Sequence, residues 1–77
     1  MTAVSIVYCK PCGYEKRAAA AAVALKKELS IAATLVPGKG GIFEVRVGDK
    51  VVAKRIKGHF PDPAEIVEAV SAAVRAG

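Results

Sequence analysis

The sequence predicts a small two-layer α/β (α+β) domain in which two helices cover a four-stranded mixed sheet. Short β-branched apolar runs alternate with amphipathic stretches, and turn residues separate them in the order β-α-β-β-β-α. The first strand–helix–strand crossover should be right-handed and place its two strands parallel, while the following hairpin adds two antiparallel strands. With 77 residues, the chain 1–77 is expected to form a single domain with one core.

The first half of the chain predicts a strand, a helix and a second strand. Residues 4–8 are short, apolar and β-branched, as in a buried strand. Over residues 14–29, apolar side chains recur at spacings of three and four, which predicts one buried helix face. Pro11 suits the first turn of this helix, because its missing N–H is not needed there. Residues 31–36 predict the second strand, and the glycine-rich residues 37–41 predict a turn.

The second half predicts a hairpin and a closing helix. Residues 42–47 alternate between apolar and polar, and Gly-Asp at 48–49 is a two-residue turn signal. Residues 50–56 return as the partner strand. Asp-Pro-Ala-Glu at 62–65 has the pattern of a capping box with proline at the first helical position, so a helix is expected to follow.

One face of the predicted sheet is left without a helix. If both helices cover the face carrying Phe43, the two-residue turn places Arg46 opposite Val51 on the other face. It also places Glu44 opposite Ala53 there. A contiguous apolar strip framed by charges indicates a dimer contact or a protein partner. The apolar side chains expected in this strip are Val7, Val36 and Val51.

The chain carries 12 basic and 7 acidic residues, a net charge of +5. Such a balance is compatible with an anionic partner. The basic side chains are scattered, however, and no ladder of aromatic residues accompanies them, so nucleic acid is not expected as a partner. The one local cluster of basic residues consists of Lys50, Lys54, Arg55 and Lys57.

The sequence also bears on location. The first residues lack the basic and apolar regions of a signal peptide, and the longest apolar run, residues 18–25, is far too short to span a bilayer. A cytoplasmic location is therefore expected, with no membrane partner. Thiols are kept reduced in that compartment.

Cys9 and Cys12 are the only cysteines, and they are placed where the first strand leads into the first helix. The positive end of a helix and the neighbouring charge of Lys10 favour a thiolate, which lowers the pKa of a thiol. A second thiol three residues away can resolve a mixed disulfide. Pro11 stiffens the turn between them. This pattern predicts thiol–disulfide exchange at Cys9 and Cys12, with Lys10 and Pro11 in support.

The cysteine pair has three other interpretations. A structural disulfide is disfavoured, because so small a loop constrains the unfolded chain little and the expected compartment is reducing. Zinc requires about four ligands, and the chain supplies two thiols and His59 unless two subunits share the metal. Copper-chaperone domains also carry C-x-x-C at this junction, but they have methionine where this chain has Val7, and they end on a strand.

Three motifs taken together resemble the selenoprotein W-like (Rdx) family, and the resemblance covers nearly the whole chain. They are Val-Tyr-Cys-x-x-Cys-Gly-Tyr at 7–14, Gly-Ile-Phe-Glu-Val at 41–45 and Lys-Gly-His-Phe-Pro at 57–61. The resemblance implies a thioredoxin-like fold and a redox function in which no metal and no cofactor beyond a redox-active disulfide takes part. The redox interpretation expects protein or small-molecule thiols and disulfides as partners. The sequence does not identify the physiological substrate or reductant, and glutathione and thioredoxin both suit the role of reductant.

The resemblance leaves the attacking cysteine open. Selenium-containing members place selenocysteine at the position of Cys12, whereas thioredoxins attack with the residue matching Cys9. Cys9 is favoured here, because a residue at a strand end is expected to be more exposed than one in a first helical turn. Thioredoxins also have a cis-proline where this chain has Gly41, so no substrate-binding residue can be assigned.

The remaining residues near the motif have weaker functional interpretations. His59 is expected to serve the connection into the last helix rather than proton transfer, and Phe60 to belong to the core. Tyr8 and Tyr14 are expected to pack, although either hydroxyl has the reach to contact a thiolate. A redox-sensing adaptor that does not turn over is the alternative to an oxidoreductase.

Overall fold

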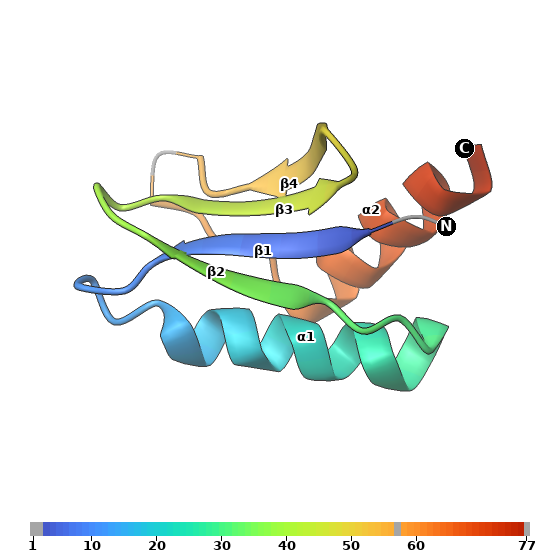
Figure 1. The fold of residues 1–77 in the computed structure, drawn as a ribbon, viewed down its shortest axis with the longest axis horizontal. Coiled ribbons are helices and arrows are strands. Elements are labelled where there is room, and N and C mark those ends of the chain that lie inside the picture. The colour runs from blue at the N-terminus through green and yellow to red at the C-terminus, as the bar shows by residue number, and fades with distance from the viewer. Residues whose placement is uncertain (1–2, 57, 77) are drawn as a thin grey trace.

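A computed structural model describes residues 3–56 and 58–76 of the chain (Figure 1). The elements follow the predicted order of strand, helix, three strands and helix. Their bounds are β1 (Val4–Cys9), α1 (Glu15–Leu29), β2 (Thr34–Gly38), β3 (Phe43–Val47), β4 (Lys50–Lys54) and α2 (Pro63–Ala76).

The four strands form one mixed sheet in the order β2-β1-β3-β4. β1 runs parallel to β2 and antiparallel to β3, and β3 and β4 form the predicted hairpin. β1 therefore has a hydrogen-bonded neighbour on each side. The predicted fold class, two layers with a four-stranded mixed sheet, is confirmed.

Both helices pack on the same face of this sheet. Along β1, Val4, Ile6 and Tyr8 are buried, while the alternate residues Ser5 and Val7 are partly exposed. α1 packs against β1 and β2, α2 packs against β3 and β4, and the two helices contact each other (Figure 1). The apolar side chains between these layers supply the main stabilising free energy of the fold. The helices contribute Ala18, Ala21, Leu25, Ile66 and Val70 to the buried cluster.

The second strand lies later in the chain than predicted. β2 starts at Thr34 rather than at Ile31, and it includes Pro37 and Gly38, which the sequence assigned to a turn. β2 is an edge strand, so a proline without an N–H is tolerated in it. Ile31 instead lies in the connection from α1, where it packs against the core.

Helix α1 begins at Glu15, so the placement of Pro11 in its first turn is wrong. Gly13 has a φ of +79°, in the left-handed region, and this interrupts any helix that would start at Pro11. Pro11 lies in the turn before the helix. The helix ends in the same manner, since Ser30 is left-handed and its N–H bonds back to the last turn.

The hairpin is one residue out of the predicted register beyond its turn. Arg46 lies opposite Val51 as predicted, but Glu44 lies opposite Lys54, and Ala53 opposite Val45. The prediction for Glu44 and Ala53 is therefore wrong. A β-bulge between Val45 and Arg46 shifts the pairing and leaves one residue of β4 without a partner.

Two strand ends also differ from the prediction. β3 begins at Phe43 instead of Ile42, and β4 ends at Lys54 instead of Ile56. Pairing continues a little further, because the N–H of Arg55 donates to the carbonyl of Phe43. Lys57, which the sequence placed in the basic cluster and in the third family motif, lies outside the described residues.

The capping box of α2 is confirmed. The N–H of Glu65 donates to the Asp62 carboxylate at 2.9 Å, and the N–H of Asp62 donates to the Glu65 carboxylate at 3.5 Å. A cap of this kind stabilises a helix by about 1 kcal/mol. It defines the start of α2, shortly after Phe60.

The face of the sheet opposite the helices keeps apolar side chains accessible. Val36 and Val51 are each 39% exposed, and Val7 is partly exposed between their strands. Val36 lies opposite Val7 in the parallel pair of β1 and β2. The exposure expected for this strip is observed, whereas its use as a contact surface stays a prediction.

Candidate functional site

Cys9 and Cys12 form a disulfide at the junction between β1 and the turn that leads to α1. Cys9 is the last residue of β1, and Cys12 lies in the turn. Their Cα atoms are 5.3 Å apart, within the range found for disulfides. The backbone therefore holds the two sulfur atoms within bonding range.

Two backbone hydrogen bonds shape this turn. The N–H of Gly13 donates to the carbonyl of Lys10 at 3.1 Å, and the N–H of Tyr14 donates to the carbonyl of Cys9 at 3.3 Å. Pro11 is the second residue of the tighter turn, a position for which its fixed φ is suited. Pro11 thus supports the site through the turn rather than through the helix.

The motif is also fixed to the two strands beside β1. The N–H of Cys9 donates to the carbonyl of Ile42 at 2.7 Å, and the N–H of Lys10 donates to the carbonyl of Gly38 at 3.2 Å. Gly38 lies opposite Cys9 in the β1–β2 pair. The sequence analysis missed both partners, because residues 37–41 were interpreted only as a turn. Their nearness depends on a pairing that no local pattern shows.

The two cysteines differ sharply in burial. Cys9 is 1% exposed, whereas Cys12 is exposed. The expectation that Cys9 is the more exposed residue is wrong. Cys9 is the last residue of β1 and its N–H is bonded to Ile42, while Cys12 lies in a turn outside any strand or helix.

Tyr8 contacts a carboxylate rather than a cysteine. Its hydroxyl donates to Glu15 at 3.5 Å. Burial of the ring, together with the negative charge and the hydrogen bond of Glu15, raises the pKa of the Tyr8 phenol above its ordinary value of 10.0. Tyr8 is therefore a neutral hydrogen-bond donor at physiological pH, and it engages the acidic residue in the first turn of α1.

An aromatic cluster supports the turn from the helix side. The ring of Tyr14 packs edge-on against Phe60 with centroids 4.8 Å apart, and Phe43 packs against Phe60 at 5.6 Å. The guanidinium of Arg17 lies 4.0 Å from the centroid of Phe60. Phe60 and Tyr14 thus pack as the sequence predicted, and Arg17 is a partner that the sequence did not reveal.

Gly41 is held by the side chain of Arg55. Arg55 donates from Nε to the carbonyl of Gly41 at 3.1 Å, and the φ of Gly41 is +77°. Gly41 stands at the position of the thioredoxin proline, and its carbonyl thus already accepts a hydrogen bond from Arg55. None of the described peptide bonds is cis.

Lys10 lies between the two cysteines in the sequence, and its side chain is exposed. His59 is also exposed, and its Nε2 lies 4.0 Å from the carboxylate of Glu65 in the cap of α2. This contact agrees with the expected role of His59 in the connection to the last helix. Lys10 remains the charged group within the motif itself.

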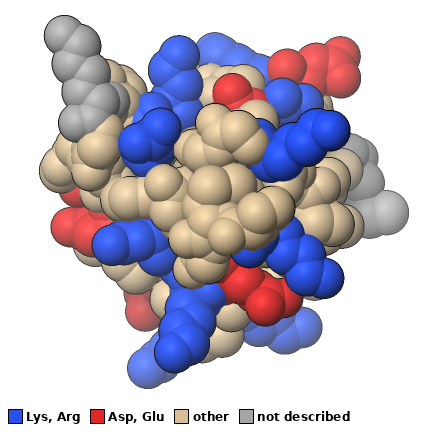
Figure 2. Space-filling model, turned by 90° about the vertical axis from the view of Figure 1, so that its left-hand side faces the viewer, with Lys and Arg blue, Asp and Glu red and all other residues tan. Residues whose placement is uncertain are grey.

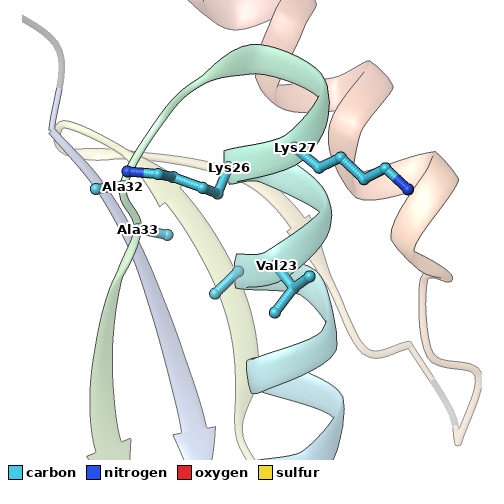
Figure 3. A pocket seen from close by; sticks show the side chains of 6 residues that line it. Val23, Lys26, Lys27, Ala32 and Ala33 are labelled. Atoms are coloured by element: carbon cyan, nitrogen blue, oxygen red, sulfur yellow. The ribbon is translucent and has the colours of Figure 1, made fainter.

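The cysteines lie away from the cavity drawn in Figure 3. That cavity has a volume of about 410 Å³, and it lies between the last turns of α1 and the residues before β2. The figure shows Val23 and Lys26 on the helix side, with Ala32 and Ala33 facing them. Neither cysteine lines it.

No metal site with three or more ligands is formed by the described residues. Within 3–56 and 58–76, no three side chains of His, Cys, Asp or Glu gather where they could hold an ion. This finding concerns sites with three or more ligands, whereas two-coordinate Cu(I) needs only two thiolates. The same residues include no helix long and apolar enough to cross a membrane.

A disulfide-bonded C-x-x-C at a strand–helix junction, on a two-layer α+β fold, fits a redox role. The chain belongs to the Rdx family, whose model matches residues 3–72. It is similar to a selenoprotein W-related protein from Vibrio cholerae, with 26% identity, coverage of 95% of this chain and 96% of that chain, and a TM-score of 0.83.

A protein from Bordetella parapertussis is equally similar in structure. Its crystal structure has a TM-score of 0.83 and 28% identity, and the match covers 94% of this chain and 96% of that one. No curated protein matches the chain. The family predicted from the three sequence motifs is therefore confirmed.

Proposed function

We propose that this protein exchanges thiols and disulfides at Cys12, with Cys9 as the resolving residue. The observation that supports this assignment is the difference in burial, because a substrate disulfide can approach an exposed sulfur and not one that is 1% exposed. The position of selenocysteine in the selenium-containing relatives agrees with it. The earlier preference for Cys9 rested on an exposure that Cys9 does not have.

The reaction has two exchange steps. In the reduced protein, the thiolate of Cys12 attacks one sulfur of a substrate disulfide, forms a mixed disulfide and releases the other sulfur as a thiolate. The thiolate of Cys9 then attacks the sulfur of Cys12 and releases the second substrate thiol. The substrate disulfide is reduced to two thiols, and the protein is left with the Cys9–Cys12 disulfide.

The surroundings of Cys12 favour its thiolate. Helix α1 starts two residues after Gly13 and has no side-chain cap, so its first N–H groups present a positive end toward the turn. Lys10 adds a positive charge within the motif. The negative charge of Glu15 opposes this effect from the first turn of α1, where its carboxylate also accepts a hydrogen bond from Tyr8.

Return to the dithiol needs an external reductant. Glutathione or a thioredoxin-type dithiol would supply two electrons by the reverse exchange, and no cofactor beyond the disulfide is required. Such donors maintain a reduced pool in the cytoplasm, which is the compartment proposed for the protein.

Trapping with single-cysteine variants tests this proposal. Reduced Cys9→Ser should accumulate a stable mixed disulfide with a peptide disulfide, because Cys12 attacks and nothing resolves the product. Reduced Cys12→Ser should form little adduct, since its remaining thiol is buried. Mass spectrometry of both variants gives the result, and adduct formation by Cys12→Ser alone would reverse the assignment.

A redox-sensing adaptor is the second candidate. The observation that favours it is the exposed strip that contains Val36 and Val51, which a partner could bind without any turnover. A turnover assay with an excess of disulfide substrate and glutathione separates the two functions. Many equivalents of product per protein indicate an oxidoreductase, and a single equivalent indicates a sensor.

A further inference from the structure

The surface around Cys12 carries positive charge from two neighbouring turns. The hydrogen bond from the backbone N–H of Lys10 to the carbonyl of Gly38 joins the cysteine turn to the turn that carries Lys39. Lys10 and Lys39 are both exposed, and neither forms an ion pair within the described residues. Figure 2 looks at this end of the molecule, where an uncharged centre is bordered by lysine and arginine side chains on several sides and by acidic side chains between them.

The acidic residues that follow the two turns each contact a side chain other than these lysines. Glu15 accepts a hydrogen bond from Tyr8 at 3.5 Å. Glu44 is bound by the guanidinium of Arg46 at 2.6 Å. The cysteine turn and the β2–β3 turn themselves contain no acidic residue. The two turns therefore contribute only positive side-chain charge beside the disulfide, from Lys10 and Lys39, while Glu15 keeps its negative charge at the start of α1.

An apolar strip leads away from this charged end along the open face of the sheet. Gly38 lies opposite Cys9, and Val36 lies opposite Val7 two residues further along the same strands. Gly38 has no side chain to screen this path, and Val36 is 39% exposed. A strip that extends over successive residues of two strands is longer than a small thiol can cover, so it fits a polypeptide.

We propose that the disulfide exchanged at Cys12 belongs to an acidic polypeptide segment. Its carboxylates lie near Lys10 and Lys39, and its apolar side chains rest on Val7 and Val36. This inference rests on the proposed function and adds the class of substrate to it. Cys12 attacks the cysteine of that segment, the partner sulfur leaves as a thiolate, and Cys9 then resolves the mixed disulfide, so the segment is reduced and the protein oxidised.

The physical effect is mainly on association. Opposite charges steer an acidic segment toward Cys12, and like charges reject a basic one. Because both lysines are exposed, the attraction is screened by salt beyond about 10 Å at 0.1 M ionic strength. The preference for acidic substrates should therefore be largest at low ionic strength.

Three ten-residue peptides test the proposal. Each has one central cysteine activated with a neutral thiopyridyl group, and its flanks are acidic, neutral or basic. The reduced wild-type protein should release thiopyridone from the acidic peptide about 10-fold faster than from the neutral one at low ionic strength. The ratio should approach one in high salt, and the basic peptide should be the slowest.

Charge variants identify the surface responsible. Lys10→Gln combined with Lys39→Gln should abolish the acidic-to-neutral rate ratio. The matched control is Lys27→Gln with Lys50→Gln, which removes two charges far from the motif and should leave the ratio unchanged. The rate with the neutral peptide reports the reactivity of Cys12 itself, so loss of all activity would contradict the proposed function, whereas equal rates for all peptides would overturn only this inference.

The apolar part is tested by peptide length and by one further pair of variants. Val36→Ser should slow the ten-residue acidic peptide, and Val23→Ser, on the exposed side of α1, should not. An acidic peptide of three residues that reacts as fast as the ten-residue peptide would overturn the assignment to a polypeptide. An equal loss in the control pair of lysine variants would show that net charge alone sets the rate, and it would overturn the proposed site.

Discussion

Gly38 of β2 lies directly opposite Cys9 of β1, and the space that a side chain at position 38 would need is already filled. A Cβ atom there would lie 2.9 Å from Cγ2 of Ile42 and 3.4 Å from Cγ1 of Val7. Ile42 in turn accepts the N–H of Cys9. Beside the buried cysteine, the side chain of Ile42 thus fills the space next to the Gly38 backbone.

Substituting Gly38→Ala should destabilise the oxidised protein by about 1–2 kcal/mol, because the added methyl overpacks against Ile42. Ile42→Ala removes the obstructing methyl group, so the double variant should lose less than the sum of the two single variants. Urea unfolding of all four proteins measures this coupling. Strict additivity would mean that the two side chains do not compete for the same space.

Tyr8 should make the protein sensitive to alkali. The raised pKa means that the folded protein binds the phenol proton more tightly than the unfolded chain does. The contribution is present below pH 10 and is lost as pH rises through the folded pKa. Tyr8→Phe should therefore show a shallower fall in unfolding free energy above pH 10 than the wild type does.

Tyr14→Phe is the control for this measurement. The Tyr14 ring packs against Phe60, whereas the hydrogen bond to Glu15 comes from Tyr8. Its free energy of unfolding should fall with alkali as in the wild type. Equal slopes for wild type and Tyr8→Phe would show that the phenol of Tyr8 ionises equally well in the folded and unfolded chains.

Mild oxidation should convert the reduced protein to the intramolecular disulfide that the structure contains. The mass should fall by two hydrogens, and no thiol should remain for alkylation. Reduction with excess dithiothreitol should restore both thiols. Labelling of both cysteines after oxidation would mean that the pair does not cycle.

Copper binding is predicted to be weak. Cu(I) accepts two thiolates, but one of the two sulfurs is almost fully buried, which leaves little room for a shared ion. Freshly purified reduced protein should contain substoichiometric copper after competition with a strong Cu(I) chelator. One equivalent that resists the chelator would support the copper-chaperone interpretation instead.

Local sequence signals predicted the elements with strong end markers. Asp62 and Glu65 specified the start of α2, and the Gly-Asp turn specified the hairpin, because each of these devices acts within a few residues. β2 was misplaced because a proline in a strand becomes acceptable only at a sheet edge. The edge position of Pro37 follows from the strand order and not from its neighbours in sequence.

The sequence predicted that the two cysteines lie close together, but it did not predict how they are arranged. Cys9, Cys12, Lys10 and Pro11 were correctly placed together, since they are adjacent in the chain. The burial of Cys9 was missed because it depends on tertiary packing and not on the neighbouring residues in the sequence. The contact of Arg55 with Gly41 was missed for the same reason.

The attack by Cys12 is the central claim, and competitive alkylation of the reduced wild-type protein tests it most directly. A limiting amount of iodoacetamide is added at neutral pH, and peptide mass spectrometry measures the labelled fraction of each cysteine. The exposed Cys12 should be labelled at least about 10-fold faster than the buried Cys9, and its labelling should persist at a pH where a free thiol reacts slowly. Faster labelling of Cys9 than of Cys12 would contradict the account.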